Sequence, residues 1–188
     1  GGTRVFGRVL ALGAPVAGGQ IVAMGFESES LLGVDVKMAR IDALGSYEFA
    51  SLAPGEYQLQ IMTPETGEAR LTLDVPEVPE YQVDLTLPEG LIAGRVLDAA
   101  SGAPIAQAML TAVSSAAVQP EGLLGAVIGR EAGLRNAWSD EEGRFAFERL
   151  EAATYELSVR PTNGYVLEQP LEIELDEGES HDDLEIRL

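Results

Sequence analysis

The stretch SDEEGRFAFERL at residues 139–150, continued by YELSV at residues 155–159, decides the fold. An Asp-x-x-Gly turn precedes a strand whose two phenylalanines fall on one face, and a second alternating strand follows. A similar sequence occurs earlier in the chain, as DALGSYEFASL at residues 42–52 and PGEYQLQI at residues 54–61. At an offset of 98 the matching pairs are Asp42/Asp140, Gly45/Gly143, Tyr47/Phe145, Phe49/Phe147, Leu52/Leu150, Tyr57/Tyr155, Leu59/Leu157 and Ile61/Val159. Such a repeat indicates that the chain contains two copies of one β-sheet unit.

The two copies also begin alike, with VFGRV at residues 5–9 and IAGRV at residues 92–96. A glycine inside a strand marks a bulge or a close approach by another group, so Gly7 and Gly94 predict such a contact, with an aromatic ring of the facing sheet as its partner. Short strands separated by Gly and Pro signals are typical of a sandwich. In the first copy they are expected at residues 5–9, 20–24, 35–41, 46–50, 56–62, 69–75 and 81–87.

The sequence therefore predicts an all-β chain of two tandem seven-stranded domains, residues 1–88 and 89–188. Alternation places Phe49, Tyr57, Phe147 and Tyr155 toward the core. The two Asp-x-x-Gly turns are expected to use the aspartate side chain as a cap and the glycine for a positive φ.

The charge of the chain excludes one class of partner. There are 31 Asp and Glu against 12 Lys and Arg, a formal net charge of −19. A phosphate backbone would be repelled, so nucleic-acid binding is not expected. No apolar run approaches the roughly 20 residues of a membrane span, and the chain has no cysteine for disulfide or thiolate chemistry.

These residues resemble the carboxypeptidase regulatory-like family, a transthyretin-like (prealbumin-like, Ig-like) β-sandwich related to the Cna B-type repeats of surface proteins. The family pattern runs from an opening strand with Gly, through Gly-x-Pro, to a Ser/Thr-Asp-x-x-Gly-x-Phe-x-Phe stretch followed by Gly-x-Tyr-x-Leu. The second copy departs from it at Ala153, where Gly is usual, and the first copy has Ile41 before Asp42.

The resemblance implies a non-enzymatic structural or protein-interaction module, a spacer or adhesive unit of a larger secreted or cell-envelope protein. Its partner would be another protein or other domains of the parent chain. The alternative function is a carbohydrate-binding accessory module of an extracellular enzyme. Some Cna B-type domains form a Lys–Asn/Asp isopeptide bond, but the only lysine is Lys37, and Arg8 and Arg95 follow the strand glycines. No isopeptide bond is therefore expected.

Catalytic and metal chemistry find little support in the sequence. The only histidine, His181, stands in an acidic run. A solvent-exposed strand residue is a simpler interpretation of it than a general base. No catalytic residue and no cofactor are expected. Calcium prefers clustered oxygens, and Asp140, Glu141 and Glu142 are the candidates for it. Turn capping and solvation are the competing interpretation of these three residues.

Two further features leave alternatives open. The single tryptophan, Trp138, precedes the Asp140 turn and is expected to be a core wedge, with a sugar-stacking platform as the alternative. The second copy also carries a longer loop between its strands, in which Leu123, Leu124, Val127 and Ile128 are apolar. This loop is expected to fold back as a lid over its own sandwich or into the junction between the units, with a docking surface for another protein or a neighbouring copy as the first alternative and disorder as the second.

Overall fold

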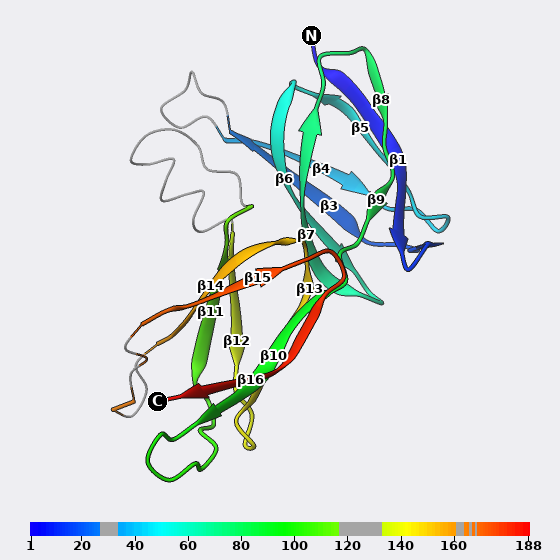
Figure 1. Ribbon diagram of the computed structural model, residues 1–188. Helices are drawn as coiled ribbons and strands as arrows, with labels where there is room; N and C mark the ends of the chain where they lie inside the picture. Colours follow the sequence, from blue (N-terminus) through cyan, green and yellow to red (C-terminus); the bar gives the residue numbers. More distant parts are fainter. Residues whose placement is uncertain (27–33, 117–132, 161–163, 166, 168) are drawn as a thin grey trace. The chain divides into compact units, whose positions relative to one another are not determined.

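The structure is a computed structural model that describes residues 1–188 apart from 27–33, 117–132, 161–163, 166 and 168. All regular elements of the described part are β-strands (Figure 1). The described residues form two compact units, Gly1–Pro88 and, leaving out 117–132, Glu89–Leu188. The predicted all-β sandwich class is confirmed.

In the first unit, two sheets form the sandwich. The described strands are β1 (Thr3–Ala11), β2 (Ala14–Pro15), β3 (Gln20–Phe26), β4 (Val34–Arg40), β5 (Ser46–Leu52), β6 (Gly55–Thr63), β7 (Gly67–Val75), β8 (Glu80–Gln82) and β9 (Leu85–Thr86). One sheet has the order β2-β1-β5, with β8 and β9 pairing β1 from its other side, and the second has the order β4-β3-β6-β7. Each of the seven expected strands of this copy is present, and the last is divided into β8 and β9.

The second unit repeats this arrangement. Its described strands are β10 (Gly90–Leu97), β11 (Met109–Ser114), β12 (Leu134–Trp138), β13 (Arg144–Leu150), β14 (Ala153–Val159), β15 (Leu171–Leu175) and β16 (Ser180–Arg187). They form a sheet of order β13-β10-β16 and a sheet of order β12-β11-β14-β15. Figure 1 shows the same pattern of a first strand lying between two partners in both units.

The first and last strands of each unit run parallel, whereas the other neighbours are antiparallel. In the first unit β1 pairs β8 and then β9 in parallel, and in the second β10 pairs β16 in parallel. A parallel pair cannot be joined by a tight hairpin. Each unit therefore closes only when its two chain ends, separated by all the intervening strands, come together.

The period-2 pattern of the strands builds one apolar core per unit. In β13, Phe145 and Phe147 are buried while Arg144, Ala146 and Glu148 are exposed. The two rings meet edge to face with centroids 6.1 Å apart, and Tyr47 and Phe49 repeat this geometry. The predicted inward orientation of the aromatic residues is confirmed, since Phe49, Tyr57, Phe147 and Tyr155 are all at most 3% exposed.

The turn before β13 matches the sequence prediction as well. Asp140 Oδ1 accepts hydrogen bonds from the backbone N–H groups of Glu142 and Arg144, at 2.9 and 2.8 Å. Asp42 Oδ1 accepts the equivalent bonds from Leu44 and Ser46. The glycines that close the two turns have φ of +72° and +81°, a conformation that glycine adopts without steric cost.

A different turn in the second unit contains Asp98, an aspartate whose pKa is lowered. Asp98 accepts hydrogen bonds from the N–H groups of Ala100 and Ser101, and the hydroxyl of Tyr165 donates to it at 2.8 Å. The bond from the Ser101 backbone, followed by that from Tyr165, lowers the pKa of Asp98 from 3.8 to about 2. These bonds tie the loop after β10 to the segment before β15.

Replacing Phe147 with alanine is expected to lower the free energy of unfolding of the second unit by about 3–5 kcal/mol, as for other buried aromatic residues. Phe49→Ala is expected to affect the first unit similarly. Glu148→Ala, at an exposed position of the same strand, is the matched control and should stay within about 0.5 kcal/mol. Denaturant unfolding measures the difference. Equal denaturation midpoints for Phe147→Ala and Glu148→Ala would show that Phe147 does not point into the core.

The stability of the second unit is expected to depend on the Asp98 carboxylate in acid. Because the folded state lowers the pKa of this group, its contribution is complete above about pH 4 and is lost as the pH falls toward about 2. Carboxyl carbon chemical shifts should place the titration of Asp98 near the lower value. Asp98→Asn should remove this part of the acid dependence of unfolding. An Asp98 that titrates at its ordinary pKa of 3.8 would contradict the hydrogen bonding described.

Candidate functional site

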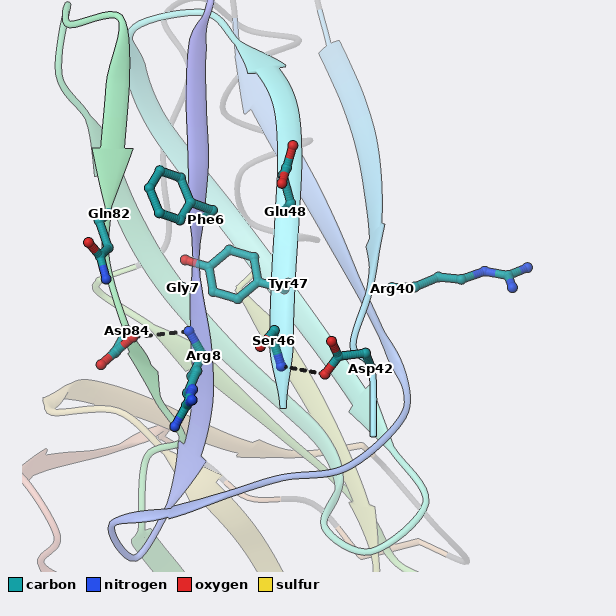
Figure 2. Close-up of a pocket in the computed structure, with 10 residues that line it drawn as sticks. All are labelled: Phe6, Gly7, Arg8, Arg40, Asp42, Ser46, Tyr47, Glu48, Gln82 and Asp84. Carbon is teal, nitrogen blue, oxygen red and sulfur yellow. Dashed lines mark hydrogen bonds between the residues drawn. The ribbon is translucent and has the colours of Figure 1, made fainter. Parts of the chain in front are cut away.

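A hollow of about 790 Å³ lies on the outer face of the β1-containing sheet of the first unit. Figure 2 shows its ten lining residues, which come from β1, from the end of β4, from β5 and the turn before it, and from the β8–β9 segment. They are Phe6, Gly7, Arg8, Arg40, Asp42, Ser46, Tyr47, Glu48, Gln82 and Asp84.

The second unit carries a hollow of about 730 Å³ at the equivalent place. Its lining residues are Ala93, Gly94, Arg95, Trp138, Asp140, Arg144, Phe145, Ala146, Asp182, Asp183, Leu184 and Glu185. The glycine, the arginine after it and the turn aspartate are shared by both hollows. The duplication has therefore preserved not only the sandwich but also one surface feature of it.

The floor of each hollow is the point where the first strand touches the last. A Cβ on Gly7 would overlap the backbone carbonyl of Val83, and one on Gly94 would overlap the carbonyl oxygen of Leu184. In the second unit, a register shift between Ile92 and Gly94 marks an irregularity at the same point. The predicted close approach at the strand glycines is thus present. Its partner is the backbone of the neighbouring strand, so the expectation of an aromatic ring from the facing sheet was wrong.

Side chains complete the strand pairing at this point in the first unit. The N–H of Arg8 donates to Asp84 Oδ1 at 3.0 Å, and the hydroxyl of Tyr47 donates to the carbonyl of Val83 at 2.6 Å. Figure 2 shows the Tyr47 ring beside Gly7, between β5 and the segment that carries Asp84. Burial, with a contribution from the Asp84 carboxylate, raises the pKa of Tyr47. The tyrosine therefore acts as a neutral hydrogen-bond donor.

The two hollows differ in the side chains around them. In the first, the Arg4 guanidinium lies 4.6 Å from the centroid of the Phe6 ring and forms ion pairs with Glu48 at 2.9 Å and Glu80 at 3.0 Å. Hydrogen bonding to Arg4 lowers the pKa of Glu48. The positions of Phe6 and Glu48 are occupied in the second unit by Ala93 and Ala146, so the second hollow has neither the phenylalanine ring nor the glutamate at these places.

Trp138 stands in the second unit where Arg40 stands in the first. It is 63% exposed, so the expectation that it is a core wedge was wrong. The physical reason is the register of β12: the preceding residue, Ala137, packs against the core, and successive side chains of a strand point to opposite faces. The indole consequently lies at the rim of the hollow.

Two of the three carboxylates considered for calcium have partners within the protein. Asp140 caps the turn through Oδ1, and Glu142 forms an ion pair with Arg144 at 3.1 Å. Within the described residues, no three His, Cys, Asp or Glu side chains are grouped as a metal site would require. Calcium binding at Asp140, Glu141 and Glu142 stays a prediction.

The other residues singled out in the sequence lie apart from the hollows or outside the described chain. His181 Nε2 is 3.2 Å from the carboxylate of Glu179, and Lys37 on β4 is 3.4 Å from Asp35. The predicted docking residues Leu123, Leu124, Val127 and Ile128 fall outside the described residues, and their role stays a prediction. The described part of the chain contains no helix able to cross a membrane.

Replacing Gly7 with alanine is expected to destabilise the first unit by about 2 kcal/mol or more, because the new methyl group forces β1 away from Val83. Gly13→Ala is the control: open space surrounds this residue and its φ is +77°, so its cost measures backbone strain alone. Denaturant unfolding should rank Gly7→Ala as the more destabilising. A smaller effect at Gly7 than at Gly13 would show that the strand contact is not tight.

Comparison with known proteins gives a family match and several structural similarities. The chain is similar to the Bacillus anthracis TIE protein, with 17% identity and a TM-score of 0.39, covering 99% of this chain and 34% of that one. A Streptococcal ancillary pilin gives 18% identity and a TM-score of 0.38, covering 98% and 61%. The shaft pilin SpaA from Lactobacillus rhamnosus GG gives 13% identity and a TM-score of 0.37, covering 98% and 97%.

The chain thus spans about a third of the TIE protein and less than two thirds of the ancillary pilin. TM-scores this low do not establish a shared arrangement or function. No curated protein matches the sequence significantly. The family model described as the carboxypeptidase regulatory-like domain matches residues 91–188, which is more than half of the 188 residues. The chain belongs to the carboxypeptidase regulatory-like domain family.

Proposed function

We propose that the chain is a non-enzymatic structural and interaction module, a pair of β-sandwiches within a larger secreted or cell-envelope polypeptide. The observation that carries this proposal is the structural use of polar groups around the first hollow and of the turn aspartate in both hollows. Asp42 and Asp140 cap turns, Asp84 pairs with the backbone of β1, and Tyr47 bonds to the carbonyl of Val83. Groups held in this way build a rigid surface and are not poised to transfer a proton.

The charge of the chain is consistent with a module whose surface is exposed to water. A formal net charge of −19 keeps a protein soluble and disfavours self-association through its surface. It also disfavours anionic partners. A structural module of this kind contributes folded length and a recognition surface to its parent polypeptide, and its partner would be a protein or another domain of that polypeptide.

One observation favours a second candidate function, a carbohydrate-binding accessory module. Trp138 is exposed at the rim of the hollow of the second unit. An exposed tryptophan on a rigid strand offers a flat apolar surface beside polar groups. A pure spacer has no need of it.

A replacement experiment in the parent polypeptide is expected to distinguish a spacer from an interaction module. The 188-residue segment is exchanged for two unrelated β-sandwiches of similar length, and the function of the parent at the surface of intact cells is measured. Retained function supports a spacer, and lost function with normal display supports an interaction module. Failure of protease to reach the parent on intact cells would contradict the proposed location. Turnover of a hydrolase substrate by the purified chain, lost in His181→Ala, would contradict the non-enzymatic role.

A further inference from the structure

We infer that the hollow of the second unit is a binding site for a neutral oligosaccharide, with Trp138 as the stacking platform. This inference rests on the second candidate function, carbohydrate binding, and assigns it a site and a ligand class; the structural role of the chain does not depend on it. It is based on the exposure of the indole, on the difference between the two hollows, and on the polar groups around the rim.

The exposed indole is the first element. Trp138 is the only tryptophan of the chain, and it is 63% exposed at the end of β12. A tryptophan in water leaves a large apolar surface uncovered. Its strand and the turn after it are fixed, because Ser139 Oγ donates to the carbonyl of Ile105 at 2.7 Å and Asp140 caps the turn. The ring is therefore carried on a rigid support.

The comparison between the units is the second element. The first hollow has an aromatic residue too, but Arg4 covers the Phe6 ring and is itself fixed by Glu48 and Glu80. In the second hollow, alanines replace Phe6 and Glu48, and Leu91 takes the position of Arg4. The two hollows have similar volumes, about 790 and 730 Å³, but they differ in the aromatic surface they offer: Arg4 covers the Phe6 ring in the first, whereas Trp138 is exposed in the second.

The polar groups of the rim are the third element, and they select the ligand class. Four carboxylates, of Asp140, Asp182, Asp183 and Glu185, line the hollow with Arg95 and Arg144. Asp140 Oδ1 also caps the turn, and Arg144 and Glu185 each form an ion pair at 3.1 Å, with Glu142 and Arg187. Carboxylates only accept hydrogen bonds and guanidinium groups only donate them. A sugar hydroxyl does both, so a pyranose ring can satisfy both kinds of group while its C–H face stacks on the indole.

Charge excludes anionic ligands. The four carboxylates and the net charge of −19 repel anionic polymers such as nucleic acids and acidic polysaccharides. The carboxylates outnumber the two arginines at the rim, so a lysine-rich peptide is the competing ligand that the experiment has to distinguish. The volume of about 730 Å³ falls within the range of roughly 300–1,000 Å³ typical of small-ligand sites, which suits a short oligosaccharide.

Intrinsic fluorescence tests the inference directly, because the single tryptophan reports only on this hollow. The 188-residue chain is titrated with neutral oligosaccharides: β-1,4-linked and α-1,4-linked glucose oligomers, and oligomers of N-acetylglucosamine. At least one is expected to produce a saturable blue shift and to protect Trp138 from acrylamide quenching. Absence of any saturable change across this panel would overturn the inference.

Variants measured by calorimetry locate the binding. Trp138→Ala should weaken binding by about tenfold or more, as for the central aromatic residue of an interface, and Trp138→Phe should restore part of the affinity. Ala93→Phe introduces the residue of the first hollow and should block binding without unfolding the chain, since Phe6 occupies that position in the first unit. Arg40→Ala, at the position equivalent to Trp138, is the control and should bind normally. Unchanged affinity in both Trp138→Ala and Ala93→Phe, or binding of an oligolysine peptide at Trp138 without oligosaccharide binding, would overturn the assignment.

Discussion

The structure of each unit depends on the contact between its first and last strands at a glycine. At Gly7 and Gly94 the neighbouring backbone lies where a side chain would otherwise stand. This parallel pairing joins residues such as Arg8 and Asp84, which are 76 positions apart, so it closes the sandwich only after the other strands are in place. The apolar core lies on one face of this strand pair and the hollow on the other, so both depend on the pairing of the first and last strands.

The duplication has kept this contact and changed what surrounds it. The first unit completes its strand pairing with the Tyr47 hydroxyl and the Asp84 carboxylate, and beside its hollow Arg4 covers the Phe6 ring and pairs with Glu48. The second unit has Phe145 in place of Tyr47 and pairs β10 with β16 through a register shift. Two copies of one scaffold can diverge in this way because the same backbone supports different side chains at its surface. Function resides in such surface sites rather than in the fold.

The sequence was sufficient for the fold but not for the hollow. The alternation around Phe145 and Phe147 and the Asp140 turn are local patterns, and local patterns predicted strands, core and turns correctly. The partner of Gly7 is far away in the chain, so no local pattern pointed to Val83. Trp138 was misassigned because it ends a strand, where a shift of one residue exchanges the core face for the solvent face. Its exposure depends on Ala137 packing inward, which the sequence alone does not reveal.

Native-state hydrogen exchange tests most directly whether the first-to-last strand contact holds each unit together. The amides of Val83 and Leu87 donate to carbonyls of β1 at 2.9 and 2.7 Å, and the amide of Leu188 donates to Leu97 on β10 at 2.9 Å. These three amides are expected to exchange only through global unfolding of their unit and to be among the slowest in the chain. Exchange of these amides as fast as that of the edge strand β4, while the amides of β6 and β14 stay protected, would contradict this expectation.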